Sequence, residues 1–183
     1  MELIQEIFDR EIDSRLLPAG RQGRGNDKGV GGSDIRYRLR RAARALIFKE
    51  NKIAVLSAEA LHLHQLPGGG VEENETILEA LEREVLEETG CIINQIRELG
   101  IIIEYRNEIE LIQVSYVFTA DVQDNSRQPV FTGEERDEGF VLEWMTVEEA
   151  IDVMRTKDKP DTYTGRFRGA RDRTIMEYYL NKK

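Results

Sequence analysis

The spacing of apolar residues divides the chain from residue 36 onward into short strands and helices. Runs with the apolar and β-branched character of strands, each bounded by polar or turn residues, occupy 43–48, 52–58, 96–106, 110–122 and 139–145. Only the residues Lys-Glu-Asn separate the first two runs, which predicts a hairpin-like turn between them. The third and fourth runs are expected to form a second strand pair.

Three other segments have helical spacing, at 76–88, 146–155 and 169–181. The first is followed by Gly90, a residue typical of helix ends. The second opens with Thr146, and Glu149 follows three residues later, which is the pattern of a capping box. Strands mixed with helices, without an internal repeat, predict one α/β domain whose mixed β-sheet is packed in a sandwich with helices.

The first 35 residues have a different character. Residues 1–17 alternate acidic and apolar positions and predict a short strand or helix, whereas 18–34 are dense in Gly and polar residues. A phosphate-cradling loop is the alternative for 18–34, but no apolar strand leads into it and no helix follows, so a flexible linker is favoured. The expected organisation is an extension over 1–35 and a main domain over 36–183.

Composition narrows the function classes. The net charge of −9 disfavours binding to a phosphate backbone, so no nucleic-acid partner is expected, while it suits divalent cations held by carboxylates. The single cysteine, Cys91, excludes an internal disulfide and fits a reducing compartment. No secretory pattern and no apolar run of membrane-spanning length is found, which predicts a cytoplasmic protein without a membrane partner.

The helix expected at 76–88 carries three carboxylates, Glu84, Glu87 and Glu88, on one face beside an apolar stripe. Like charges at this spacing repel, and they lie near the negative end of the helix dipole. A hard divalent cation bound by the carboxylate oxygens would offset both effects. The alternative is a solvated acidic face, and the helix alone does not decide between the two.

Residues upstream of the helix extend the pattern. Gly69 is followed after five residues by Glu75, and seven further residues lead to Arg83-Glu84. The stretch then continues with Val85, one residue, Glu87-Glu88, one residue, Gly90 and Cys91. This spacing resembles the signature of the Nudix hydrolases, which covers residues 69–91. Cys91 is the one departure, at a place where the family has an aliphatic residue, and a buried cysteine behaves as a small hydrophobe.

The resemblance implies a Nudix-type α/β/α sandwich and the hydrolysis of a diphosphate linkage with Mg²⁺ or Mn²⁺. The expected substrate is a nucleotide-type small molecule: a nucleoside triphosphate, an oxidised nucleotide or a nucleotide sugar. The alternative is a Nudix-like regulatory module that binds a nucleotide without catalysis. A homodimer is left open.

Roles for residues of the motif follow from the same resemblance. The metal ligands implied are the side chains of Glu84, Glu87 and Glu88 and the backbone of Gly68. Gly69 and Gly70 would let the backbone approach the substrate closely. Glu75 and Gly90 are structural, and Arg83 either ties the loop to the helix through Glu75, which is favoured, or faces phosphate directly.

Outside the motif, the sequence does not decide whether several charged residues act in the site or are simply exposed to solvent. A general base is expected in the loop at 133–139, where Glu135 is a candidate together with Glu134 and Glu138. Arg38 alternates with Arg36 and Arg40 along a strand and is a candidate phosphate contact. Near the C-terminus, the arginine-rich stretch 164–173 would either close over the nucleotide or form a helix cap or surface patch. His62 and His64 are expected to share a strand face as structural or substrate-lining residues.

Overall fold

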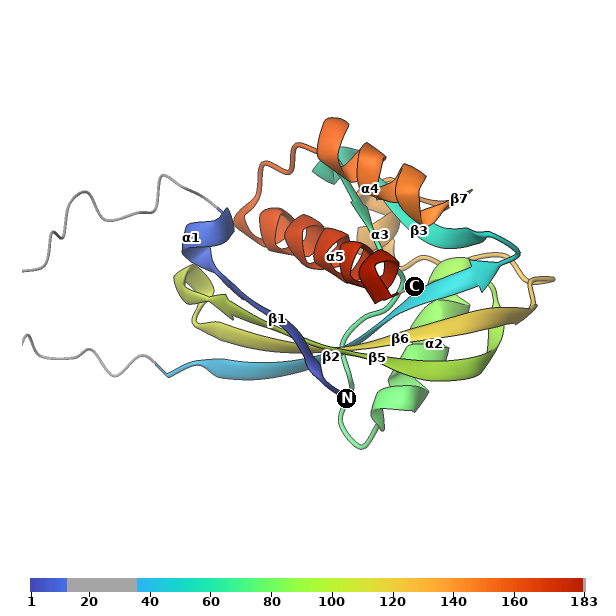
Figure 1. The fold of residues 1–183 in the computed structure, drawn as a ribbon, viewed down its shortest axis with the longest axis horizontal. Coiled ribbons are helices and arrows are strands. Elements are labelled where there is room, and N and C mark those ends of the chain that lie inside the picture. The colour runs from blue at the N-terminus through green and yellow to red at the C-terminus, as the bar shows by residue number, and fades with distance from the viewer. Residues whose placement is uncertain (13–35, 183) are drawn as a thin grey trace, which may run out of the picture.

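The computed structural model describes residues 1–12 and 36–182, and the linker expected at 18–34 lies outside these ranges. Within these ranges, seven strands form one mixed sheet in the order β1-β5-β6-β2-β3-β4, with β7 paired to β3 (Figure 1). The strands are β1 (Leu3–Phe8), β2 (Arg38–Lys49), β3 (Lys52–Ala58), β4 (Leu63–Gln65), β5 (Ile92–Arg106), β6 (Leu111–Asp124) and β7 (Phe140–Met145). The expected α/β fold with a mixed sheet is confirmed.

Helices cover both faces of this sheet. In Figure 1, α4 and α5 lie on one side of the long strands and α2 lies on the other. The helices are α1 (Asp9–Ile12), α2 (Ile77–Thr89), α3 (Gly133–Asp137), α4 (Val147–Thr156) and α5 (Tyr163–Lys182), with short 3₁₀ turns η2 (Glu59–Leu61) and η3 (Asn107–Ile109). In the part of the chain that the structure describes, no helix has the length and apolar character to cross a membrane.

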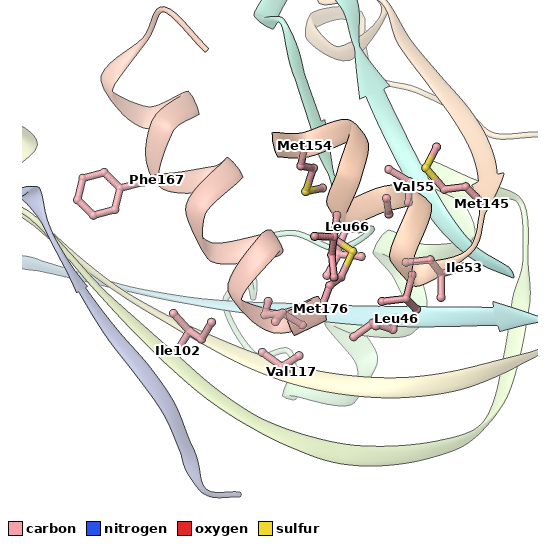
Figure 2. Close-up of a cluster of buried hydrophobic side chains, with 14 of the residues drawn as sticks. Leu46, Ile53, Val55, Leu66, Ile102, Val117, Met145, Met154, Phe167 and Met176 are labelled. Atoms are coloured by element: carbon pink, nitrogen blue, oxygen red, sulfur yellow. The ribbon is translucent and has the colours of Figure 1, made fainter. Parts of the chain in front are cut away.

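Alternate residues of β2 face two separate cores. Leu46 packs on the α5 side with Ile102, Val117 and Met176 (Figure 2). Its neighbours Ala45 and Ile47 face the opposite way, into a core formed mainly with α2 and β6. The small alanines at 43 and 45 let α2 approach the sheet closely, so the acidic end of α2 lies next to β2.

In the hairpin expected after residue 48, antiparallel pairing between β2 and β3 is limited to the residues next to the turn. Only Phe48 and Lys49 pair with β3, while residues 38–48 of β2 pair in parallel with β6. The other edge of β2 is taken by the glycine-rich loop, because the amides of Ala43 and Ala45 donate to the carbonyls of Gly69 and Pro67 at 3.0 and 3.2 Å. This pairing fixes the loop directly between β2 and α2.

Other expectations about elements need correction. The last helix begins at Tyr163, six residues before the predicted start, and the loop after β6 contains the short helix α3. His62 precedes β4 with a φ of 47°, so it does not share a strand with His64. The N-terminal segment, by contrast, forms one of the two elements expected there, the strand β1, which pairs in parallel with β5.

Candidate active site

Both ends of α2 are fixed by local interactions. Thr76 and Glu79 form a capping box at the start, where each side chain accepts a hydrogen bond from the other's backbone amide. Gly90 ends the helix with a φ of 69°, and a Cβ at this position would lie 2.3 Å from the carbonyl oxygen of Arg127. Only glycine fits there, so the helix stops at a defined residue and its carboxylates point in a defined direction.

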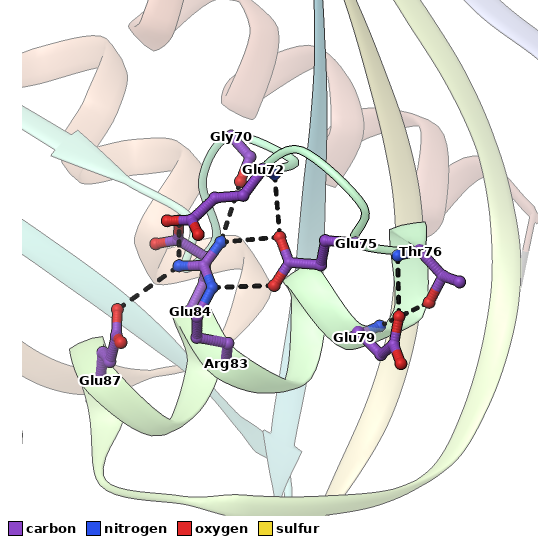
Figure 3. A network of polar contacts seen from close by, with 8 residues as sticks. All are labelled: Gly70, Glu72, Glu75, Thr76, Glu79, Arg83, Glu84 and Glu87. Atoms are coloured by element: carbon purple, nitrogen blue, oxygen red, sulfur yellow. Dashed lines mark hydrogen bonds and ion pairs between the residues drawn. The ribbon is translucent and has the colours of Figure 1, made fainter.

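Arg83 ties α2 to the loop before it (Figure 3). Its Nε and Nη2 donate to the two carboxylate oxygens of Glu75 at 2.9 and 3.0 Å, and Nη2 also donates to the carbonyl of Gly70 at 3.0 Å. Nη1 donates to Glu84 Oε1 at 2.8 Å. The hydrogen bonds to Arg83 lower the pKa of Glu75. The hydrogen-bond donors of Arg83 are thus directed to acceptors within the protein, as the structural role favoured from the sequence requires.

The three carboxylates of α2 have different environments. Glu88 is buried, and its Oε2 accepts a hydrogen bond from the amide of Gly68 at 2.6 Å. Glu84 is partly buried between Arg83 and Gly69, whereas Glu87 is exposed and approaches Arg83 only at 3.5 Å. Burial raises the pKa of Glu88 to about 8, which the nearby Arg44 and the Gly68 amide oppose.

A cavity of about 290 Å³ opens beside these carboxylates. Side chains of both charges line it, and the lining residues come from β2, the glycine loop, α2, the α3 segment and α5. Its lining consists of Arg40, Arg44, Gln65, Gly68, Gly69, Gly70, Glu84, Glu88, Thr132, Glu134, Glu135, Glu138, Phe140 and Arg168. The predicted site residues that are not part of this lining are Arg38, Glu75, Arg83, Glu87 and Gly90.

Arg44 is the site residue that the sequence analysis missed most clearly. Its side chain is buried, yet neither Nε nor Nη1 has a hydrogen-bond partner among the described residues. Burial lowers the pKa of Arg44 to about 10, and the positive charge of Arg171 adds to this effect. A buried guanidinium with unused donors at a cavity wall is suited to an anionic ligand. Gln65 and Thr132 also line the cavity and were not anticipated.

The acidic loop expected to hold a general base does reach the cavity. Glu134, Glu135 and Glu138 all line it. Glu135 also caps α3, because its Oε2 accepts a hydrogen bond from the amide of Thr132 at 2.7 Å. For Glu138, burial raises the pKa of the carboxyl, and Arg168 across the cavity opposes this. Glu138 is therefore as well placed for proton transfer as Glu135.

The histidines have structural surroundings. Asp158 accepts from the backbone amide of His64 at 2.8 Å and contacts His64 Nδ1 at 2.6 Å. This joins β4 to the segment after α4. His62 lies near Asp161 at 3.4 Å, with both side chains largely exposed. Neither histidine lines the cavity described above.

Glu84 and Glu88 are the side chains of the site that could hold the divalent cation implied by the motif. Across residues 1–12 and 36–182, no three His, Cys, Asp or Glu side chains are grouped closely enough to hold a metal ion. One oxygen of Glu84 is bound to Arg83 and one oxygen of Glu88 is bound to Gly68, which leaves each carboxylate a second oxygen. Carboxylate oxygens are the ligands that Mg²⁺ and Mn²⁺ prefer, so the chemistry of the donor set fits such an ion.

Sequence comparison places this site within a known domain. A family model described as NUDIX domain matches residues 38–165. The chain is similar to Nudix hydrolase 18, mitochondrial, of Arabidopsis thaliana, with 39% identity over 66 residues, which are 36% of this chain and 38% of that protein. It is also similar to Nudix hydrolase 12, mitochondrial, of the same plant, with 32% identity over 116 residues, or 57% and 54% of the two chains. The matches therefore span at most about half the length of these relatives.

Solved structures with the same fold include two bacterial proteins. A Nudix hydrolase from Nitrosomonas europaea superposes with a TM-score of 0.56 and 22% identity, covering 80% of this chain and 91% of that chain. The MutT Nudix hydrolase from Burkholderia pseudomallei has a TM-score of 0.50 and 20% identity, covering 73% and 97%. At this level of identity the likeness shows the fold.

Proposed function

The chain belongs to the Nudix hydrolase family, and on this premise we propose that it hydrolyses a diphosphate linkage in a nucleoside diphosphate derivative with the help of a divalent cation. The observation that carries the proposal is the composition of the cavity. Three guanidinium groups, those of Arg40, Arg44 and Arg168, line it together with the carboxylates of Glu84 and Glu88. Guanidinium groups suit phosphate oxygens, and carboxylates suit the cation that accompanies a diphosphate.

Each group of residues has its own task in this proposal. Arg44 and Arg168 would bind and orient the phosphates, and the Gly68–Gly70 loop would allow close approach of the backbone. A divalent cation held by Glu84 and Glu88, with Glu87 joining from the helix end, would neutralise charge and acidify a water molecule. Glu135 or Glu138 would take the proton from the attacking water. We propose Mg²⁺ or Mn²⁺ as the cation.

The panel that tests the proposal contains nucleoside triphosphates, oxidised nucleotides and nucleotide sugars, each with Mg²⁺ or Mn²⁺ and each with excess chelator. Released phosphate, pyrophosphate and nucleoside monophosphate are measured. Metal-dependent release from at least one class supports the hydrolase. Saturable binding without release from any member would favour the nucleotide-binding regulatory module instead.

Replacing Arg44 with methionine is expected to change affinity and stability in opposite directions. The variant should raise KM for the substrate by about 10- to 100-fold, because one charged hydrogen-bond donor to phosphate contributes about 1.5–3 kcal/mol. The same change removes a buried charge without hydrogen bonds at two of its nitrogens, so the metal-free and ligand-free protein should unfold at a higher temperature. Steady-state kinetics and thermal unfolding measure the two effects, and an unchanged KM would contradict a phosphate role for Arg44.

Gly69→Ala is expected to reduce kcat by about 10- to 100-fold through displacement of Glu84, since misplacement by about 1 Å can cost that much. A Cβ at Gly69 would lie 2.1 Å from Glu84 Oε1, so the flexible carboxylate must move while the backbone needs no change. The control is Gly169→Ala in α5, where a Cβ would meet Leu63 at 3.5 Å, an ordinary contact. Equal kcat in the two variants would mean that the position of Glu84 does not matter for turnover.

We also propose that the protein works in a reducing compartment. Cys91 is buried and free, and it packs in the core beneath α2 as a small apolar side chain. Oxidation or modification of this thiol would disturb the packing of the site helix.

A further inference from the structure

A row of polar side chains crosses the sheet on the face covered by α5. Strand register places Arg40 of β2 opposite Gln113 of β6, and Gln113 opposite Glu104 of β5. Gln113 and Glu104 are fully buried, whereas the side chain of Arg40 reaches the wall of the cavity. The row therefore leads from the interior of the protein to the wall of the site.

Hydrogen-bond polarity gives this row one orientation. Arg40 Nη1 donates to Gln113 Oε1 at 2.6 Å, and Gln113 Nε2 donates to Glu104 Oε2 at 2.7 Å. A carboxylate only accepts hydrogen bonds and a guanidinium only donates them. Rotating the amide of Gln113 by half a turn would place donor against donor and acceptor against acceptor. Glu104 thus forces the carbonyl oxygen of Gln113 towards Arg40.

Glu104 is itself held from two further sides. Arg106 Nη2 donates to Glu104 Oε1 at 2.7 Å, and Arg171 Nη1 lies 3.7 Å from Glu104 Oε2. Both arginines are buried. A carboxylate fixed by two cations has little freedom to rotate, so the acceptor that orients Gln113 is rigid.

At the outer end of the row, the guanidinium of Arg40 lies against the glycine loop. A Cβ at Gly70 would come within 2.9 Å of Arg40 Nη2, so the absence of a side chain there makes room for the guanidinium. Burial lowers the pKa of Arg40, and the positive charges of Arg106, Arg171 and Arg168 lower it further. An anion bound at this point would relieve that repulsion.

We propose that Gln113 is a positioning residue, which holds the guanidinium of Arg40 beside Gly70 so that it can bind a phosphate group of the substrate. The side chain of Gln113 is buried and does not line the cavity. It would therefore affect the bound phosphate through its hydrogen bond to Arg40. This inference rests on the proposed hydrolysis of a diphosphate at the same site. The hydrogen bond from Arg40 to Gln113 fixes the rotamer of Arg40 before the ligand binds. Less side-chain entropy is then lost on binding than for an unrestrained arginine.

The test measures binding rather than turnover, so that it can be separated from the test of the hydrolase. Isothermal titration calorimetry gives the Kd of methylenediphosphonate, a diphosphate analogue that cannot be hydrolysed, in the presence of Mg²⁺. Arg40→Met should weaken binding by about 10- to 100-fold, the value of one charged hydrogen bond. Gln113→Met, of similar volume, should weaken it by about 10-fold, as expected when a supporting partner is lost. Thermal unfolding checks that each variant is folded.

A double-mutant cycle separates positioning from general damage to the core. In the Arg40→Met background, Gln113→Met should change Kd by less than about 2-fold, because its effect is transmitted through Arg40. The matched control is Ser115→Ala, another buried polar residue of β6 on the same face, which accepts from Gln113 Nε2 at 3.2 Å and does not touch Arg40. Ser115→Ala should leave Kd within about 2-fold, because Glu104 still accepts from Gln113 Nε2 at 2.7 Å and keeps the amide in the same orientation.

Three results would overturn the inference: a Kd unchanged by Arg40→Met, a Gln113→Met effect of equal size in both backgrounds, or no saturable binding of the analogue to the unmodified protein. The first of these applies even when Gln113→Met does not fold. Binding that follows the expected cycle in a protein without turnover on any nucleotide would refute the hydrolase and leave the positioning role in place.

Discussion

Exchange of Glu88 for glutamine is expected to lower kcat by more than about 100-fold. Loss of a residue that only supports a metal ligand lowers activity by up to about 100-fold, and loss of a ligand itself should cost more. Glutamine keeps the size of the side chain and can still accept the hydrogen bond from Gly68, but it brings no charge to a divalent cation. The fold should survive, because a neutral side chain in this buried position requires no desolvation of charge. Steady-state kinetics on the panel substrate gives the loss in kcat.

Stability measurements on the same variant give a second, independent readout. The pKa of Glu88 rises from its ordinary value of 4.5 to about 8 on folding, so the folded protein without metal binds a proton more tightly than the unfolded chain. The stability of the metal-free protein should therefore fall as pH rises from about 4.5 to about 8, and this part of the fall should be absent in Glu88→Gln. Stabilisation by added Mg²⁺ should decrease in the variant as well.

Glu82→Gln is the matched control for this experiment. Glu82 lies on the same helix with its side chain exposed and outside the cavity lining. It should retain wild-type kcat and the same response to Mg²⁺. Wild-type turnover by Glu88→Gln would contradict the assignment of Glu88 as a metal ligand, on which the interpretation of the motif depends.

The parts of the site that the sequence predicted are those set by local geometry. The spacing of Glu84 and Glu88 places both on one helix face, and the stop at Gly90 follows from backbone conformation alone. The pairing of Glu75 with Arg83 was implied by the family resemblance, and it involves only a short loop that folds back on the helix that follows it. Residues within about twenty positions of one another could therefore be placed before any tertiary structure was considered.

The parts that were missed depend on partners far away in the chain. Arg44 stands in an apolar run, and the alternation of Arg40 with Arg44 along β2 was the available signal. Recognising it required knowing that the strand extends to Arg38 and keeps its parallel register with β6. The sequence leaves the stretch 164–173 open between closing over the nucleotide and forming a helix cap or surface patch. In the structure it lies within α5, where Arg168 lines the cavity while Arg171 and Asp172 are buried in the core. No local pattern distinguishes an arginine with a buried acidic partner from one in solvent.

The same buried pair is the basis of the largest effect on stability that we expect. Asp172 accepts three hydrogen bonds: from Arg171 Nε at 2.6 Å, from Arg171 Nη2 at 3.0 Å and from the amide of Leu66 at 2.9 Å. Both side chains are at most 1% exposed. The pair thus joins α5 to the backbone just before the glycine loop, and its loss would affect both the core and the site.

Asp172→Asn should reduce the free energy of unfolding by about 3–5 kcal/mol, the usual cost of leaving one member of a buried ion pair without its partner. Asparagine has a single acceptor oxygen, so its amide group must face either the Arg171 guanidinium or the Leu66 amide, donor against donor. Urea unfolding measures the change. Glu177→Gln is the control, because it breaks the ion pair with Arg155 on the exposed side of α5 and should cost at most about 1 kcal/mol. Equal losses of unfolding free energy in the two variants would show that the buried Arg171–Asp172 pair stabilises the fold no more than an exposed ion pair does.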